Sequence, residues 1–266
     1  MLRSAGEATL TQGPWIYRRL RDQLGSIRKV YVSADRVERR DDFAGREVVL
    51  LLHGFFQTRN IWEVMEDRLR HDGYSVMSFD VGGLLARFNT KPVDRLAVWM
   101  AAKIEGLTAR HGFEAIHVIG HSKGGLVARR YIQHHGGGRR VKGLITLGTP
   151  HHGAPTAIVA MPLQAVASVS ELMPYSKVVR ALNRDTFPAH VPLTSIYSTG
   201  DLVCPSWASV LRPRDGESSM SNVRVTGIGH SQLTWDPGVY RVVHARLQEA
   251  TRLWNERSGA APSVTD

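Results

Sequence analysis

Apolar residues along the chain gather in short runs, and segments of helical character lie between most of these runs. A continuous apolar run indicates a strand covered on both faces, as in the centre of a parallel sheet. The runs predict strands over residues 30–32, 48–52, 74–79, 116–119, 144–147, 193–197 and 223–226. The segments between them predict helices over residues 61–71, 93–110, 123–135 and 239–255. This alternation predicts an α/β fold, with a mainly parallel central sheet and helices on both faces.

The length and composition agree with one large domain. The chain has 266 residues, 42% of them hydrophobic, and α/β folds of this size often form a single domain. No internal repeat or linker divides the sequence. We therefore expect one domain over residues 1–266, with a short cap or lid insertion at about 151–190 and a frayed tail at 258–266.

Residues 115–125 (AIHVIGHSKGG) place a serine between an apolar strand and a helix. A tight turn at this point forces Ser122 into a sparsely populated backbone conformation and exposes its hydroxyl. Gly120 and Gly124 lie two residues before and two residues after the serine, where side chains would crowd it. The free amides at the start of the helix favour negative charge at the same point. The pattern indicates a nucleophilic serine.

A second apolar run, EVVLLL at residues 47–52, leads into a His-Gly-Phe loop. We expect the backbone amide of Phe55 to face the serine from this loop, and the amide of Lys123 to face it from the start of the helix. Two such donors would hold the oxyanion of a tetrahedral intermediate, and the loss of one costs about 3 kcal/mol. This role uses only backbone atoms, so the Phe55 ring is free to cover the core.

Two later segments, each a strand followed by a loop, supply an acid and a base. Asp201 follows the apolar run at 193–197, and His230 follows the run at 223–226. A serine hydroxyl needs a base to take its proton, and a carboxylate must hold the imidazole of that base in the right tautomer. Asp201 and His230 fit these roles. Asp236 is the competing carboxylate, although its place before Pro237 suits the N-cap of a helix.

These motifs resemble those of the α/β-hydrolase superfamily, and within it the bacterial triacylglycerol lipases and related carboxylesterases. The resemblance rests on HGF at 53–55, GHSKGG at 120–125 and TLGTPHHG at 146–153, and it extends from about residue 48 to the end. It implies a nucleophile, an acid and a histidine in that chain order, which is the order of the proposed triad. Lys123 departs from the Met, Gln or His of many such lipases. Its amide can serve equally, whereas a cation beside the nucleophile bears on substrate preference.

The resulting hypothesis is a serine hydrolase that cleaves carboxylic esters through an acyl-enzyme intermediate, with a lipase favoured over a small-ester esterase. No cofactor is implied. A thioesterase or a phospholipase stays an alternative, because the fold alone does not separate these activities. A catalytically silent protein that holds anionic lipid or nucleic acid on a basic face is the alternative from another class, and the complete triad argues against it. The expected partner is therefore a small-molecule or lipid ester, and no nucleic acid.

Residues 151–170 contain no Asp, Glu, Lys or Arg and are rich in Ala, Val, Ile, Leu and Met. Because this segment follows the carboxyl end of a strand, we expect it to lie over Ser122 as a cap that lines an acyl pocket. A core helix is the alternative interpretation. Pro155, Pro162 and Pro174 favour short broken pieces over one long helix.

The net charge of +10 raises the question of a membrane surface. Basic and apolar residues interleave over residues 15–29, as in an amphipathic helix that lies on anionic lipid. We favour the simpler interpretation of a surface helix with a solvated basic face. No apolar stretch near the N-terminus suits a signal peptide, and none is long enough to span a bilayer. The sequence as written therefore predicts a cytoplasmic location, with secretion or peripheral membrane contact left open.

The sequence gives little support to metal or thiol chemistry. A single cysteine, Cys204, allows neither a disulfide nor a thiolate zinc site. His151 and His152 are adjacent, so their side chains point opposite ways in an extended segment. For His53 and His121 we expect packing and local hydrogen bonds. No metal site is predicted.

Overall fold

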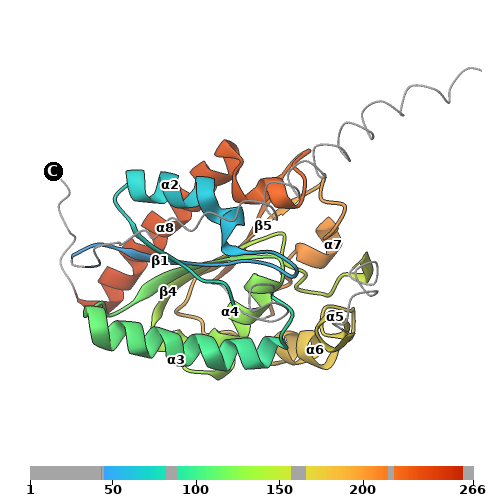
Figure 1. The fold of residues 1–266 in the computed structure, drawn as a ribbon, viewed down its shortest axis with the longest axis horizontal. Coiled ribbons are helices and arrows are strands. Elements are labelled where there is room, and N and C mark those ends of the chain that lie inside the picture. Colours follow the sequence, from blue (N-terminus) through green and yellow to red (C-terminus); the bar gives the residue numbers. More distant parts are fainter. Residues whose placement is uncertain (1–42, 44, 82–88, 157–165, 215–218, 260–266) are drawn as a thin grey trace, which may run out of the picture.

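A computed structural model of the chain describes residues 43, 45–81, 89–156, 166–214 and 219–259. Within them, six strands form one parallel sheet in the order β2-β1-β3-β4-β5-β6 (Figure 1). The strands are β1 (Val48–Leu52), β2 (Ser75–Ser78), β3 (Ile116–His121), β4 (Val141–Leu147), β5 (Leu193–Ser198) and β6 (Met220–Val225). The α-helices are α2 (Glu63–His71), α3 (Val93–His111), α4 (Lys123–His134), α5 (Val166–Ser170), α6 (Lys177–Arg184), α7 (Ser206–Ser209) and α8 (Pro237–Ser258). Short 3-10 helices are η1 (Arg59–Trp62), η3 (Gly137–Arg139) and η5 (Ser231–Thr234).

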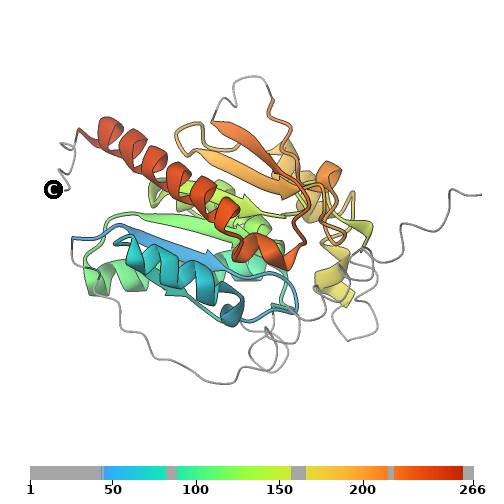
Figure 2. The ribbon, with the colours of Figure 1, turned by 90° about the horizontal axis from the view of Figure 1, so that it is seen from above.

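The side chains of β1 alternate between two hydrophobic cores, one on each face of the sheet. Val48, Leu50 and Leu52 pack with residues of α3 and α4, whereas Val49 and Leu51 pack with residues of α2 and α8. Figure 1 shows these helix pairs on opposite sides of the strands, and Figure 2 looks onto the side of α2 and α8. Burial of each such side chain contributes about 1.5–3 kcal/mol. The unbroken apolar run of β1 therefore follows from a sheet covered on both faces.

The predicted fold class is confirmed, and the predicted elements within the described residues are present with shifted bounds. The largest shifts are three residues: β4 begins at Val141 and not at residue 144, β6 begins at Met220 and not at 223, and α8 ends at Ser258 and not at 255. Lys142 interrupts the apolar run near the start of β4. Its amine donates to the Glu47 carboxylate at 2.7 Å, at the amino end of the strand. The strand predicted at 30–32, the basic segment at 15–29 and the end of the predicted tail, 260–266, lie outside the described residues.

Because the strands run parallel, their carboxyl ends meet at one edge of the sheet, on the right in Figure 1. The loops that follow β1 and β3 at this edge carry Phe55 and Ser122. The loops that follow β5 and β6 carry Asp201 and His230. The topology thus gathers the sequence-predicted site residues at a single edge.

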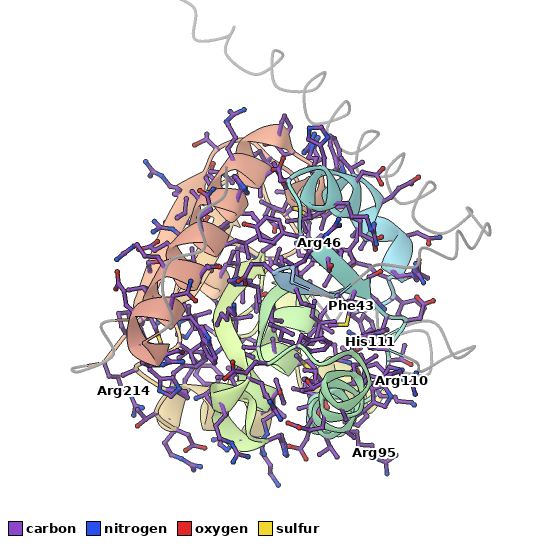
Figure 3. All side chains as sticks on the ribbon, turned by 90° about the vertical axis from the view of Figure 1, so that its left-hand side faces the viewer. Phe43, Arg46, Arg95, Arg110, His111 and Arg214 are labelled. Atoms are coloured by element: carbon purple, nitrogen blue, oxygen red, sulfur yellow. The ribbon has the colours of Figure 1, made fainter. Side chains whose placement is uncertain are left out.

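Figure 3 views the molecule from the other end, where the strands begin. Phe43 packs there against His111, with ring centroids 4.7 Å apart. The exposed Arg46 and Arg110 lie near this pair, and the exposed Arg214 lies at the opposite side of the view. These arginines carry part of the positive charge at the end of the molecule away from Ser122. No helix among the described residues combines the length and the apolarity needed to cross a bilayer.

The predicted cap segment is described on both sides of residues 157–165, which lie outside the described residues. Its described part contains two short helices, α5 and α6. Leu172, Leu182 and Phe187 belong to the same core as α3 and α4, so this part of the segment is anchored to the main body. The amide of Ala154 donates to the Leu172 carbonyl at 2.8 Å and ties the two described parts together. The cap remains a prediction.

Candidate active site

Ser122 lies at the turn between β3 and α4 in a strained backbone conformation. Its φ is 52° and its ψ is −125°, a combination that L-residues rarely adopt. The Ser122 amide donates to the Leu147 carbonyl at 2.9 Å, and the Thr149 hydroxyl donates to the Ser122 carbonyl at 2.9 Å. These two bonds come from the end of β4 and the loop after it, and they hold the serine in place despite the strain.

The glycines around the serine are required by close backbone approach. A Cβ on Gly124 would lie 2.2 Å from the Leu52 carbonyl oxygen, and one on Gly120 would lie 2.6 Å from the Gly125 Cα. Real Cβ atoms do not approach other heavy atoms this closely. The missing side chains therefore let the start of α4 pack directly against the end of β1.

The loop after β1 lies directly against the turn that carries Ser122. A Cβ on Gly54 would lie 2.7 Å from the Ser122 Cβ, so the two backbones almost touch. The Gly54 amide donates to Oε1 of Gln57 at 2.7 Å, and Phe56 adopts a positive φ of 54°. This compact turn holds Phe55 between two fixed neighbours. Lys123, the first residue of α4, has one of the amides that the helix leaves without an intrahelical acceptor.

The structure brings His230 and Asp201 together. Nδ1 of His230 donates to Oδ2 of Asp201 at 2.7 Å, and the Asp201 side chain is fully buried. The other carboxylate oxygen, Oδ1, accepts from the amides of Val203 and Cys204 at 2.9 Å and 2.7 Å. With both oxygens engaged, the carboxylate is fixed in orientation and fixes the imidazole in turn.

The competing carboxylate has another use. Oδ1 of Asp236 accepts from the amides of Gly238 and Val239 at 2.7 Å and 3.0 Å, which makes Asp236 the N-cap of α8. No hydrogen bond joins the Ser122 hydroxyl to His230 within the described part of the chain. His121, which precedes Ser122 in the chain, packs against His230 with ring centroids 4.5 Å apart.

The side chain of Lys123 is buried, and its amine forms hydrogen bonds to neutral groups. Its ammonium donates to the carbonyls of Asn89 and Lys91 and to the hydroxyl of Ser168 in α5, and it lies 5.6 Å from the centre of the Phe55 ring. Burial lowers the pKa of Lys123 to about 7. The amine thus joins α4 to α5 and is enclosed by these partners.

Several other histidines near this edge are buried and neutral. Burial lowers the pKa of His53 to about 4, and its Nε2 accepts from the Val81 amide at 3.3 Å. Burial, reinforced by the Arg129 charge, also holds the pKa of His151 well below its usual value.

Among the described residues, no cluster of three or more His, Cys, Asp or Glu side chains is arranged to hold a metal. Burial raises the pKa of the Cys204 thiol, which lies 3.1 Å from the Ser209 hydroxyl.

Sequence reasoning missed two side chains of this site, Gln57 and Thr149. Gln57 fixes the loop after β1, and Thr149 fixes the carbonyl of Ser122. Both act through backbone groups of residues that only the folded sheet brings near. Only the folded chain links Thr149 to the small residue at 125, since a Cβ on Gly125 would lie 2.1 Å from the Thr149 hydroxyl.

Comparison with protein families matches residues 47–236 to the model of the alpha/beta hydrolase fold. The matched region includes every strand described above and the loops that carry Ser122, Asp201 and His230. The chain belongs to the α/β-hydrolase family.

Solved structures of lipases show the same fold. The mature form of the lipase BlEst2 from Bacillus licheniformis matches with a TM-score of 0.62 and 18% identity, over 80% of this chain and 96% of that one. The monoacylglycerol lipase of Paleococcus ferrophilus matches with a TM-score of 0.55 and 14% identity, over 77% of this chain and 94% of that one. At these identities the likeness concerns the fold.

One curated protein matches a short stretch. The dihydrolipoyllysine-residue acetyltransferase component of the acetoin cleaving system of Cupriavidus necator is 39% identical over 88 residues. These residues are 32% of this chain and 22% of that protein, so the chain matches about a fifth of the length of this relative.

Proposed function

We propose that the protein is a serine hydrolase that cleaves carboxylic esters. The observation that carries the proposal is the 2.7 Å hydrogen bond from His230 to the buried Asp201, beside a serine in a strained turn. The same constellation of nucleophile, base and orienting carboxylate recurs in hydrolases of unrelated folds. Similarity in fold to proteins named as lipases adds support.

In the first half of the proposed reaction, the Ser122 hydroxyl attacks the ester carbonyl carbon while Nε2 of His230 takes its proton. The oxyanion accepts hydrogen bonds from the amides of Phe55 and Lys123. Collapse of the tetrahedral intermediate breaks the bond to the alcohol, and His230 returns the proton to the departing oxygen. The acyl group is left as an ester of Ser122.

In the second half, water attacks the acyl-enzyme and His230 again serves as the base. The tetrahedral intermediate collapses, Ser122 regains its proton from His230, and the carboxylic acid leaves. Asp201 holds Nδ1–H of His230 throughout and stabilises the imidazolium that forms in each half. Every proton removed by His230 is returned, so no cofactor is required.

We further propose that the acyl group contacts the cap segment at 151–190. The charge-free stretch at 151–170 suits an apolar chain, and its described end is joined to α4 through Ser168 and Lys123. This favours a lipase over an esterase of small esters. Thioesters and phospholipids are the competing substrate classes.

The test is hydrolysis of p-nitrophenyl esters of graded chain length by wild type, Ser122→Ala and Ser258→Ala. Loss of the nucleophile should reduce kcat by several orders of magnitude. Ser258 is exposed at the far end of α8, so its variant should match wild type and controls for contaminating esterases. Ser122→Ala with more than about a hundredth of wild-type turnover would refute the proposal. Faster cleavage of an acyl thioester or a phospholipid than of every ester would replace its substrate class.

A further inference from the structure

The imidazole of His121, the last residue of β3, lies between two loops of the candidate site. Its Nδ1 is 2.9 Å from Oε1 of Gln57, in the loop that also carries Phe55. Its Nε2 is 3.1 Å from the backbone carbonyl oxygen of His230. The ring is 0% exposed, so both contacts are made away from water.

Both partners of this ring are hydrogen-bond acceptors. The amide of Gly54 donates to Oε1 of Gln57 at 2.7 Å, which identifies that atom as the oxygen of the side-chain amide. The partner on the other side is a carbonyl oxygen. A neutral imidazole carries one N–H, so a neutral His121 donates one proton to one acceptor at a time.

The surroundings of His121 disfavour a second proton. Burial, reinforced by repulsion from a protonated His230, holds the pKa of His121 well below its usual value. The His230 backbone bond acts in the opposite direction and is outweighed. Trp62 covers the ring edge-on, with centroids 6.3 Å apart. A charged His121 would also repel the imidazolium that the proposed reaction forms on His230, 4.5 Å away between ring centroids.

We propose that His121 is a positioning residue that couples the loop of residues 53–57 to the backbone of His230. The proposal rests on the proposed function. The single ring N–H donates either to Gln57, which holds the loop that carries one oxyanion donor, or to the His230 carbonyl beside the base, and the buried ring packs between the two. The two groups must act on the same reacting carbonyl, so a fixed distance between them lowers the barrier without strengthening substrate binding.

The test is a double-mutant cycle with p-nitrophenyl butyrate. His121→Phe keeps a ring against Trp62 and His230 but makes neither hydrogen bond, and Gln57→Met keeps the length of the side chain without its oxygen. Each single variant should lose about tenfold in kcat, the worth of one buried hydrogen bond, with KM within about twofold of wild type. The double variant should lose no more than the worse single variant, because both break one link.

His117 supplies a matched control on the same strand. It is also fully buried and contacts Glu47 and Thr251 at 3.1 Å and 3.0 Å, near the amino end of the strand. His117→Phe should lower the melting temperature and leave kcat unchanged. If His121→Phe behaves in the same way, or if the losses of the single variants multiply in the double variant, the inference is wrong.

Conservative variants keep the test decisive if His121→Phe does not fold. His121→Asn places an amide near the position of Nδ1, and His121→Gln places one near Nε2, so each can restore one half of the link. Both should recover part of the lost kcat relative to His121→Ala, and no recovery by either overturns the inference. Ser122→Ala is measured alongside. An active Ser122→Ala refutes the proposed function, whereas an inactive one combined with normal kcat in the His121 variants refutes the positioning role alone.

Discussion

Asp201 and His230 form a 2.7 Å hydrogen bond although 29 positions separate them in the chain. The bond depends on the pairing of β5 with β6, which brings the loops after these strands side by side. Its geometry leaves Nε2 of His230 as the nitrogen available to a reacting hydroxyl. The orientation of the imidazole is therefore set by backbone topology as well as by the carboxylate.

Asp201→Asn should reduce turnover far more than Asp236→Asn. The amide at 201 can present its NH₂ to Nδ1 and stabilise the wrong tautomer, which costs about ten-thousand-fold in serine proteases. Asn is as good an N-cap as Asp, so the change at 236 should cost less than about 1 kcal/mol of stability and little activity. Steady-state kinetics and melting curves of both variants provide the check. A larger loss of turnover at 236 would transfer the orienting role to Asp236.

Ser122→Gly should be more stable than Ser122→Ala, although neither should hydrolyse esters. Glycine adopts a φ of 52° with a ψ of −125° without a steric penalty, whereas alanine keeps the backbone strain of the turn between β3 and α4. Strain of this kind costs about 1–3 kcal/mol, and glycine relieves it. The extra freedom of glycine in the unfolded chain offsets about 0.5–1 kcal/mol of this stabilisation. Urea unfolding of the two variants measures the difference. Equal or greater stability of the alanine variant would mean that the turn at position 122 is unstrained.

Gly124→Ala should destabilise the protein by about 3 kcal/mol or more, because the new methyl group would meet the Leu52 carbonyl at 2.2 Å and backbone cannot easily move. Gly106 is the matched control. It lies exposed within α3 with nothing within 4 Å of a Cβ, so Gly106→Ala should gain about 0.5–1 kcal/mol. Chemical denaturation of the pair tests the close approach of α4 to β1. A Gly124→Ala variant as stable as Gly106→Ala would contradict it.

The stability of the wild type relative to Lys123→Met should rise with pH. In the folded protein burial lowers the Lys123 pKa to about 7, against an ordinary value of 10.5. At a pH between these two pKa values the unfolded chain binds one more proton than the folded protein. The free energy of unfolding of the wild type therefore increases as the pH rises, and it decreases again as the pH falls towards 7. Below pH 7 the difference between the two proteins should be flat. Urea denaturation at several pH values from 6 to 10 checks this, and a flat difference throughout would mean that the amine is solvated.

The sequence predicted the fold well because its signals are local. The apolar run of residues 48–52 indicates a strand without reference to any partner, and the glycines at 120 and 124 mark a crowded turn wherever the rest of the chain lies. The choice of Asp201 over Asp236 could also be argued locally, since Asp236 precedes a proline at a helix start. In the structure the Asp201 carboxylate accepts from His230, and the Asp236 carboxylate accepts from an amide in the first turn of α8.

The supporting contacts could not be predicted in the same way. His121 was expected to have only a local hydrogen bond, yet its partners lie 64 and 109 positions away. Lys123 appeared as a cation beside the nucleophile, whereas its amine is enclosed by carbonyls from residues 89 and 91 and by a hydroxyl of α5. Such contacts depend on the path of distant loops, which composition and spacing do not encode.

The strand order also dictates where a ligand would sit. The chain leaves β1 for α2 on one face of the sheet and leaves β3 for α4 on the other, and β1 and β3 are neighbours. The winding reverses between these two strands, and at such a topological switch point the connections diverge and open a crevice beyond the carboxyl ends. Gly54 and Ser122 lie in the loops that follow these two strands. In the proposed hydrolase, an inert residue at position 122 would leave this strand order unchanged, so loss of catalysis need not mean loss of ligand binding.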